Sequence, residues 1–176
     1  MIPQKEFYFL RHGQTDYNLN QVKFDHPPHV PLNETGRRQA AAIEPIIANL
    51  PIKTICYSPM LRAVQTKEII ASRLLVPQFE IPDLGECSAL VWQQMPMMKT
   101  HPFTSLQEPV LGFMQRVQKG LQSALAYEGP ILIVAHGGVH WALCSLLNIA
   151  GHEWSIDNCV PVHFYIINGQ WHARPA

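Results

Sequence analysis

An arginine and a histidine stand side by side where an apolar run of the chain meets a glycine. Phe7–Leu10 is followed directly by Arg11, His12 and Gly13. A guanidinium is a fork of N–H donors that suits the oxygens of phosphate or carboxylate, and a neutral imidazole is a nucleophile near neutral pH. A buried arginine–carboxylate pair and a packed core histidine would give the same residues, so the pair alone does not specify chemistry.

Two later apolar runs end in similar groups. The run KTICYS is followed by SPMLRAVQT, which starts at its last residue and contains Arg62. The run ILIVA is followed directly by His136, Gly137 and Gly138. Guanidinium groups and the free N–H groups at the start of a helix both bind phosphate oxygens, and glycine lets the backbone come close to a ligand. The three run ends together predict an anion pocket, to which Asn18 adds an amide donor.

The elements that must position these groups alternate along the chain. We expect buried strands at residues 7–10, 53–58, 78–82, 131–135 and 161–169, and helices at residues 36–50, 58–74, 107–127 and 138–147. Alternating helices and strands that are apolar throughout predict a three-layer α/β/α sandwich with a mostly parallel central sheet. Ligands bind at the carboxyl ends of the strands in such sheets, where the three run ends would meet.

Local signals refine this pattern. Ser58 followed by proline predicts the start of a helix, because a hydroxyl caps the free N–H groups and proline fits the first helical position. Pro45 predicts a kink or an early break in the helix around it. Residues 84–106, rich in methionine and proline, are expected to be irregular.

Composition favours one soluble globular domain over residues 1–176, with 47% hydrophobic and 15% charged residues. The formal net charge of zero recommends neither nucleic acid nor a membrane surface as a partner. The absence of a signal-like segment and of a long apolar stretch predicts a cytoplasmic protein. The four cysteines form no C-x-x-C pair, which favours reduced thiols; they are Cys56, Cys87, Cys144 and Cys159.

Five segments, taken in order, resemble the signature blocks of the histidine phosphatase superfamily, also called the phosphoglycerate mutase-like family. They read LRHGQTDYN, PLNETGRRQA, SPMLRAVQT, LGE and VAHGG, and they span about residue 8 to residue 138. The resemblance implies the phosphoglycerate mutase-like form of the α/β/α sandwich and a phosphoryl-transfer reaction.

The resemblance also implies roles for individual residues. His12 would be the nucleophile that forms a phosphohistidine. The phosphoryl oxygens would be bound by side chains and one backbone N–H group, namely Arg11, Asn18, Arg62, His136 and Gly137. Cations around the transferring phosphoryl group stabilise the negative charge of the transition state, which is the main contribution of a protein to phosphoryl transfer.

The general acid is assigned to Glu86, which matches the family's acid in the segment DLGEC. The segment that follows, ECSALVWQQMP, keeps Trp92 but lacks the glycines that many family members have there. Asp83 is therefore the alternative acid, and Glu80 a weaker one.

Residues 87–106 provide the material for a short cap over the pocket. A small cap leaves water access to a phosphohistidine, which favours a phosphatase over a mutase. Trp92 and the methionines of this segment suit a phosphorylated small molecule with an apolar portion, or a phosphorylated side chain of a protein.

No cofactor or catalytic metal is expected, because no zinc-enzyme helix motif occurs among the nine histidines. His26 and His29 of the proline-rich loop could bind a metal adventitiously. A mutase-type phosphotransferase and a protein that binds a phosphorylated ligand without turnover stay as alternatives.

Overall fold

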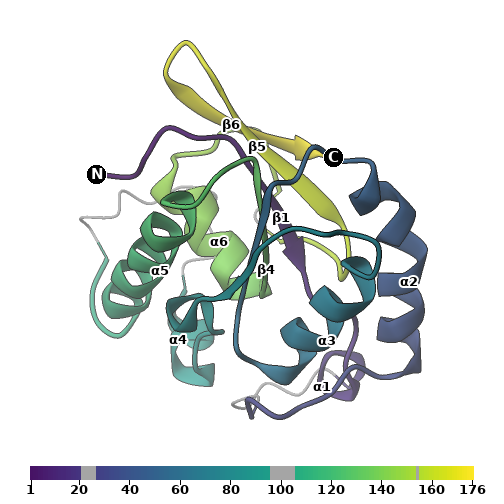
Figure 1. Ribbon diagram of the computed structural model, residues 1–176. Coiled ribbons are helices and arrows are strands. Elements are labelled where there is room, and N and C mark those ends of the chain that lie inside the picture. Colours follow the sequence, from purple (N-terminus) through teal and green to yellow (C-terminus); the bar gives the residue numbers. More distant parts are fainter. Residues whose placement is uncertain (21–26, 96–105, 154) are drawn as a thin grey trace.

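The computed structural model describes residues 1–20, 27–95, 106–153 and 155–176 (Figure 1). Its strands are β1 (Phe7–Arg11), β2 (Thr54–Tyr57), β3 (Gln78–Glu80), β4 (Ile131–Ala135), β5 (Pro161–Ile167) and β6 (Gln170–Pro175). Its helices are α1 (Asp16–Leu19), α2 (Glu34–Ala48), α3 (Leu61–Ile70), the 3-10 helix η1 (Pro82–Leu84), α4 (Ala89–Gln94), α5 (Val110–Leu125) and α6 (Gly137–Leu146).

The strands form one sheet in the order β3-β2-β4-β1-β5-β6. β3, β2, β4 and β1 run parallel to one another, while β5 is antiparallel to β1 and β6 is antiparallel to β5. The sheet is therefore mostly parallel, as the sequence predicts. β2, β4 and β1 are adjacent, so the three strand ends that carry the candidate phosphate-binding groups meet at one edge of the sheet.

Helices cover both faces of this sheet, with α2 and α3 on one side and α5 and α6 on the other (Figure 1). β1 shows why both faces must be covered, because its side chains alternate between two apolar clusters. Phe7 and Phe9 pack with residues of α5 and α6, and Tyr8 and Leu10 pack with residues of α2 and α3. This arrangement confirms the three-layer α/β/α sandwich.

Two glycines let the turn after β1 lie against the start of α2. A Cβ atom on Gly13 would sit 2.5 Å from the carbonyl oxygen of Gly36, a distance that side-chain carbon atoms do not tolerate. A Cβ atom on Gly36 would in turn collide with the backbone of Gln14. The glycine after His12 therefore serves a close backbone contact that fixes the path of the chain beside the histidine.

Several local expectations are wrong. α3 begins at Leu61, with Met60 rather than Ser58 as its N-cap. Pro45 lies inside α2, which continues to Ala48, so the helix does not break at this proline, and the kink stays a prediction. The segment expected to be irregular contains α4, whose N-cap Ser88 accepts a hydrogen bond from the backbone of Val91.

The C-terminal strand is half of a hairpin. β5 and β6 are joined by Asn168 and Gly169, both with positive φ, which is the backbone that a tight hairpin turn requires. β6 was not predicted from the sequence, although the Asn-Gly pair signals it.

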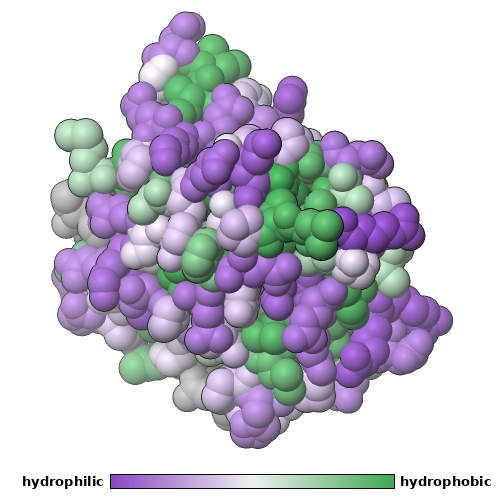
Figure 2. All heavy atoms as spheres, viewed as in Figure 1, coloured by the Kyte–Doolittle hydropathy of each residue, from purple (hydrophilic) through white to green (hydrophobic). Residues whose placement is uncertain are grey.

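The surface combines hydrophilic and apolar side chains. Hydrophilic side chains cover most of the face shown in Figure 2, and apolar ones form small separate patches. Among the helices that the structure describes, none is long and apolar enough to cross a membrane.

Candidate active site

His12 lies at the end of β1, where its ring is held in one orientation. The side chain is 2% exposed, and its Nδ1 lies 2.7 Å from the carbonyl oxygen of Gly13. A carbonyl oxygen only accepts hydrogen bonds, so Nδ1 carries the proton and Nε2 carries the lone pair. The Nε of Arg62 donates to this Nε2 at 3.3 Å. His12 thus presents a neutral, nucleophilic nitrogen toward a guanidinium.

Two arginines stand around this nitrogen. Arg62, from the first turn of α3, is 1% exposed and also donates to the carbonyl oxygen of Pro27 at 3.3 Å. Arg11 ends β1 and donates from Nη1 to the carbonyl oxygen of Ile156 at 2.7 Å. Burial lowers the pKa of both guanidinium groups, and the Glu86 carboxylate opposes that shift. Both remain cations near neutral pH, because a guanidinium titrates far above it.

His136 is the third strand-end residue, directly after β4. Its ring is fully buried and lies 5.2 Å from the ring of His12, centroid to centroid. Burial, and then the charges of Arg62 and its neighbours, lowers the pKa of His136 well below the usual range. The imidazole is therefore neutral at pH 7.

Ser58 contacts one ring nitrogen of His136. Its Oγ lies 2.7 Å from Nε2 of His136 and accepts a hydrogen bond from the backbone N–H of Met60 at 3.3 Å. A hydroxyl has one proton and two acceptor lone pairs, so Ser58 can donate to Nε2 or accept from it. When Ser58 donates, Nδ1 of His136 bears the ring proton and is a donor.

Two buried nitrogens at this place have no partner among the described residues, namely Nε of Arg11 and Nδ1 of His136. An unpaired buried polar group is costly and calls for an explanation such as a bound ion or a catalytic role. Nε of Arg11 is a donor only, so an anion such as a phosphoryl group satisfies it, and the same anion satisfies Nδ1 of His136 when that nitrogen bears the ring proton.

Glu86 reaches the same edge of the sheet from the segment after η1. Its Oε2 accepts the backbone N–H of Gly138 at 3.2 Å, and its Oε1 accepts its neighbour Cys87's N–H at 3.0 Å. A Cβ atom on Gly138 would collide with Oε1 of Glu86. Glycine at this position therefore makes room for the carboxylate at the start of α6.

Gly137 opens α6 beside Arg11. A Cβ atom there would lie 3.6 Å from Cζ of Arg11 and 3.8 Å from the indole of Trp92, both ordinary contacts. The backbone N–H of the first helical residue has no acceptor within the helix, so it is available to an anion. The indole places an apolar wall next to this donor.

Arg116 of α5 holds the backbone around the acid. Its guanidinium donates to the carbonyl oxygens of Asp83 and Gly85, each at 2.9 Å, and of Glu86 at 3.1 Å. The carboxylate of Asp83 instead pairs with Lys119 at 3.2 Å. The geometry therefore favours Glu86 over Asp83 as the carboxyl group that acts at this edge of the sheet.

Asn18 has a different described role. Its amide oxygen accepts the backbone N–H of Thr15 at 3.1 Å, and the hydroxyl of Thr15 accepts the backbone N–H of Asn18 at 3.2 Å. This reciprocal pair caps the short helix α1. The role of its amide as a hydrogen-bond donor to the phosphoryl group stays a prediction.

The structure thus brings together Arg11, His12, Arg62 and His136, with Gly137 and Glu86 beside them. Three supporting residues escaped the sequence analysis: Ser58, Arg116 and Asn158, whose amide donates to the carbonyl oxygen of His12 at 2.7 Å. Ser58 had been assigned to a helix cap, and a single arginine or asparagine carries no pattern of its own.

Chemically, this arrangement combines the nucleophilic nitrogen of His12, the cations of Arg11 and Arg62, the neutral imidazole of His136 and the carboxyl group of Glu86. The nitrogen of His12 can attack a phosphorus atom, and the two cations and the imidazole can hold the oxygens of the phosphoryl group. The carboxyl group can transfer a proton.

The chain is similar to known proteins in sequence and in fold. A family model described as "Histidine phosphatase superfamily (branch 1)" matches residues 7–174. The uncharacterized phosphatase PhoE of Bacillus subtilis is 33% identical over 151 residues, which cover 82% of this chain and 77% of that protein.

Other similarities cover different extents. An agropine synthesis reductase of Rhizobium rhizogenes is 34% identical over 94% of this chain, but the chain spans only 40% of that protein's length. A mycobacterial glucosyl-3-phosphoglycerate phosphatase has the same fold, with a TM-score of 0.74 and 22% identity. That likeness covers 97% of this chain and 98% of the solved one.

Proposed function

The chain belongs to the histidine phosphatase superfamily, and we propose that it is a phosphatase that hydrolyses phosphate monoesters without a metal ion, through a phosphohistidine at His12. The observation that carries this proposal is the orientation of His12. Its Nδ1 is tied to the carbonyl oxygen of Gly13, and its lone pair on Nε2 faces Arg62.

In the first step, Nε2 of His12 attacks the phosphorus atom and the bond from phosphorus to the ester oxygen breaks. The leaving oxygen takes a proton from the carboxyl group of Glu86. Arg11, Arg62 and Nδ1–H of His136 hold the three equatorial oxygens, on which the transition-state charge is spread.

In the second step, a water molecule attacks the phosphorus atom of the phosphohistidine. Its proton passes to the Glu86 carboxylate, the bond between phosphorus and Nε2 breaks, and inorganic phosphate leaves. Each group returns to its starting state, so the cycle needs no cofactor.

For the substrate, we propose a phosphorylated small molecule with an apolar or aromatic portion. Support comes from Trp92 beside the start of α6. A phosphorylated protein side chain stays as the second prediction. Residues 96–105, which make up half of the expected cap, lie outside the described residues. The single domain with its cap at 87–106, and the cytoplasmic location, also stay predictions.

The test is phosphate release from aryl, alkyl and sugar monoesters and a phosphopeptide, with a chelator present. Wild type, His12→Ala and the control His172→Ala, on the far strand β6, are compared. We expect release by wild type and the control only. Transfer to a second alcohol in preference to water would favour a mutase. Stabilisation by the esters without release by wild type would favour a binding protein.

A further inference from the structure

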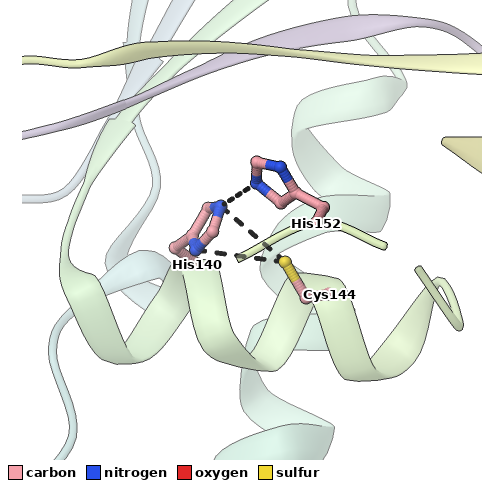
Figure 3. Close-up of side chains that lie close together, drawn as sticks. All are labelled: His140, Cys144 and His152. Carbon is pink, nitrogen blue, oxygen red and sulfur yellow. Dashed lines mark hydrogen bonds between the residues drawn. The ribbon is translucent and has the colours of Figure 1, made fainter. Parts of the chain in front are cut away.

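A second cluster of potential ligands lies outside the site described above. His140 and Cys144 stand one turn apart on α6, and His152 lies on the segment after this helix (Figure 3). The Nε2 atoms of the two histidines are 3.2 Å apart, and Sγ of Cys144 lies 3.7 Å from Nε2 of His140. One ligand atom from each residue lies within 4.8 Å of the others.

We propose that these three residues bind a zinc ion. In a tetrahedral site with Zn–N bonds of about 2.05 Å and a Zn–S bond of about 2.3 Å, two nitrogens are about 3.3 Å apart, and a nitrogen and a sulfur about 3.6 Å. The N–N separation of 3.2 Å and the N–S separation of 3.7 Å match these values. Because Sγ also lies 3.9 Å from Nδ1 of His140, the sulfur is beside the ring rather than along the Nε2 lone pair, so the His140 ring must turn for the ion to bind both atoms. The separation between the ligand atoms of His152 and Cys144 is at most 4.8 Å, so these two must approach by at most about 1.2 Å.

The donor chemistry favours zinc. Two imidazoles and one thiolate are the nitrogen and sulfur ligands that this borderline-soft ion prefers, and hard ions such as Mg²⁺ and Ca²⁺ take oxygen instead. His140 and Cys144 are buried, while His152 is only partly covered. His152 therefore leaves a side from which the ion can enter and at which a water molecule can complete four ligands.

Binding changes protons as well as bonds. The thiol of Cys144 gives its proton to solvent and its sulfur bonds the metal. Both histidines bind through Nε2, so each keeps its proton on Nδ1. The contact between the two Nε2 atoms, which without metal needs a proton on one of them, is replaced by two bonds to the ion.

The place of the cluster suggests what the ion does. It would join α6 to the chain segment that leads back to the active site. Within that segment Ile156 accepts the hydrogen bond of Arg11, and Asn158 donates to the backbone of His12. The ion is thus structural: it ties these supports to the helix that begins beside His136, and it takes no part in phosphoryl transfer.

The experiment uses the full chain, stripped with a chelator under reducing conditions and titrated with Co²⁺, which replaces Zn²⁺ and reports its ligands by absorbance. We expect one Co²⁺ per chain, a near-ultraviolet band from sulfur-to-cobalt charge transfer, and displacement of the band by one equivalent of Zn²⁺.

Variants identify the ligands. Cys144→Ser should lose the band, while Cys56→Ser keeps it, because Cys56 is an equally buried thiol on β2. His152→Ala, a partly exposed position that tests the site even if the serine variant fails to fold, should weaken Co²⁺ binding at least about tenfold. His29→Ala, on an exposed loop, should bind as wild type.

Three results would overturn the proposal. They are the absence of a sulfur-to-cobalt band in wild type, a band of full intensity in Cys144→Ser, and wild-type affinity in His152→Ala. None of these readouts involves phosphate release, so they test the zinc site independently of the proposed phosphatase activity.

Discussion

The two glycines that open α6 offer a paired perturbation of the proposed acid. In Gly138→Ala the new Cβ atom would overlap Oε1 of Glu86 and lie 2.9 Å from Sγ of Cys87. Ordinary contact begins near 3.4 Å, so the carboxylate must move by roughly 1 Å. In Gly137→Ala the nearest atoms of Arg11 and Trp92 are already at ordinary contact distances.

A misplacement of about 1 Å costs about 10²-fold in rate. We therefore expect kcat of Gly138→Ala to fall by about 10² on an alkyl phosphate and Gly137→Ala to stay close to wild type. Both variants keep the backbone N–H, and alanine is a better helix former than glycine. Unfolding temperatures measured beside the rates show whether the loss has a folding origin.

The leaving group sharpens the assay. A p-nitrophenyl ester needs little help from an acid, because its leaving oxygen is stable as an anion, so Gly138→Ala should lose less activity on it than on an alkyl ester. Equal losses on the two esters, or equal losses in the two alanine variants, would refute the claim that Gly138 makes room for a catalytic Glu86.

Three further outcomes are expected from the same geometry. Glu86→Gln should slow turnover by ~10²–10⁴. Asp83→Asn should not slow it, because this variant loses only the ion pair with Lys119. If steady-state assays gave the reverse ranking, Asp83 and not Glu86 would be the general acid. Ser58→Ala should lower kcat by up to about tenfold, because the hydrogen bond that holds the His136 ring is lost. An unchanged kcat would contradict that positioning role. His136 binds a proton near pH 6.5 in the unfolded chain but not in the folded protein, where its ring is buried. The free energy of unfolding should therefore fall as the pH drops below about 6.5, by up to about 1.4 kcal/mol per pH unit for this group. Urea titrations across this pH range should show a shallower fall in His136→Gln than in wild type.

That these groups meet at one edge of the sheet could be predicted from the sequence, because they stand at the ends of strands that lie side by side. β2, β4 and β1 are parallel neighbours, so residues that directly follow them must meet. Arg11, His12 and His136 are placed by this rule, and Arg62 follows one helical turn into α3.

The supporting contacts could not be predicted in the same way. Arg116 meets the acid segment across 30 residues of sequence, and Asn158 meets His12 across 146. Such contacts depend on how helices and loops pack, which leaves no periodic signal. β6 and α4 are different, because the Asn-Gly turn and the Ser88 cap were present as local signals and were not used.

The most direct test of the phosphatase mechanism is to trap its intermediate. Wild type is mixed with a phosphate monoester in the presence of a chelator and quenched with alkali, which preserves phosphohistidine. The phosphorylated residue is then located by mass spectrometry. We expect phosphate on His12 in wild type and none in His12→Ala. Steady release of phosphate with no phosphate on His12, or at the same rate in His12→Ala, would contradict this mechanism.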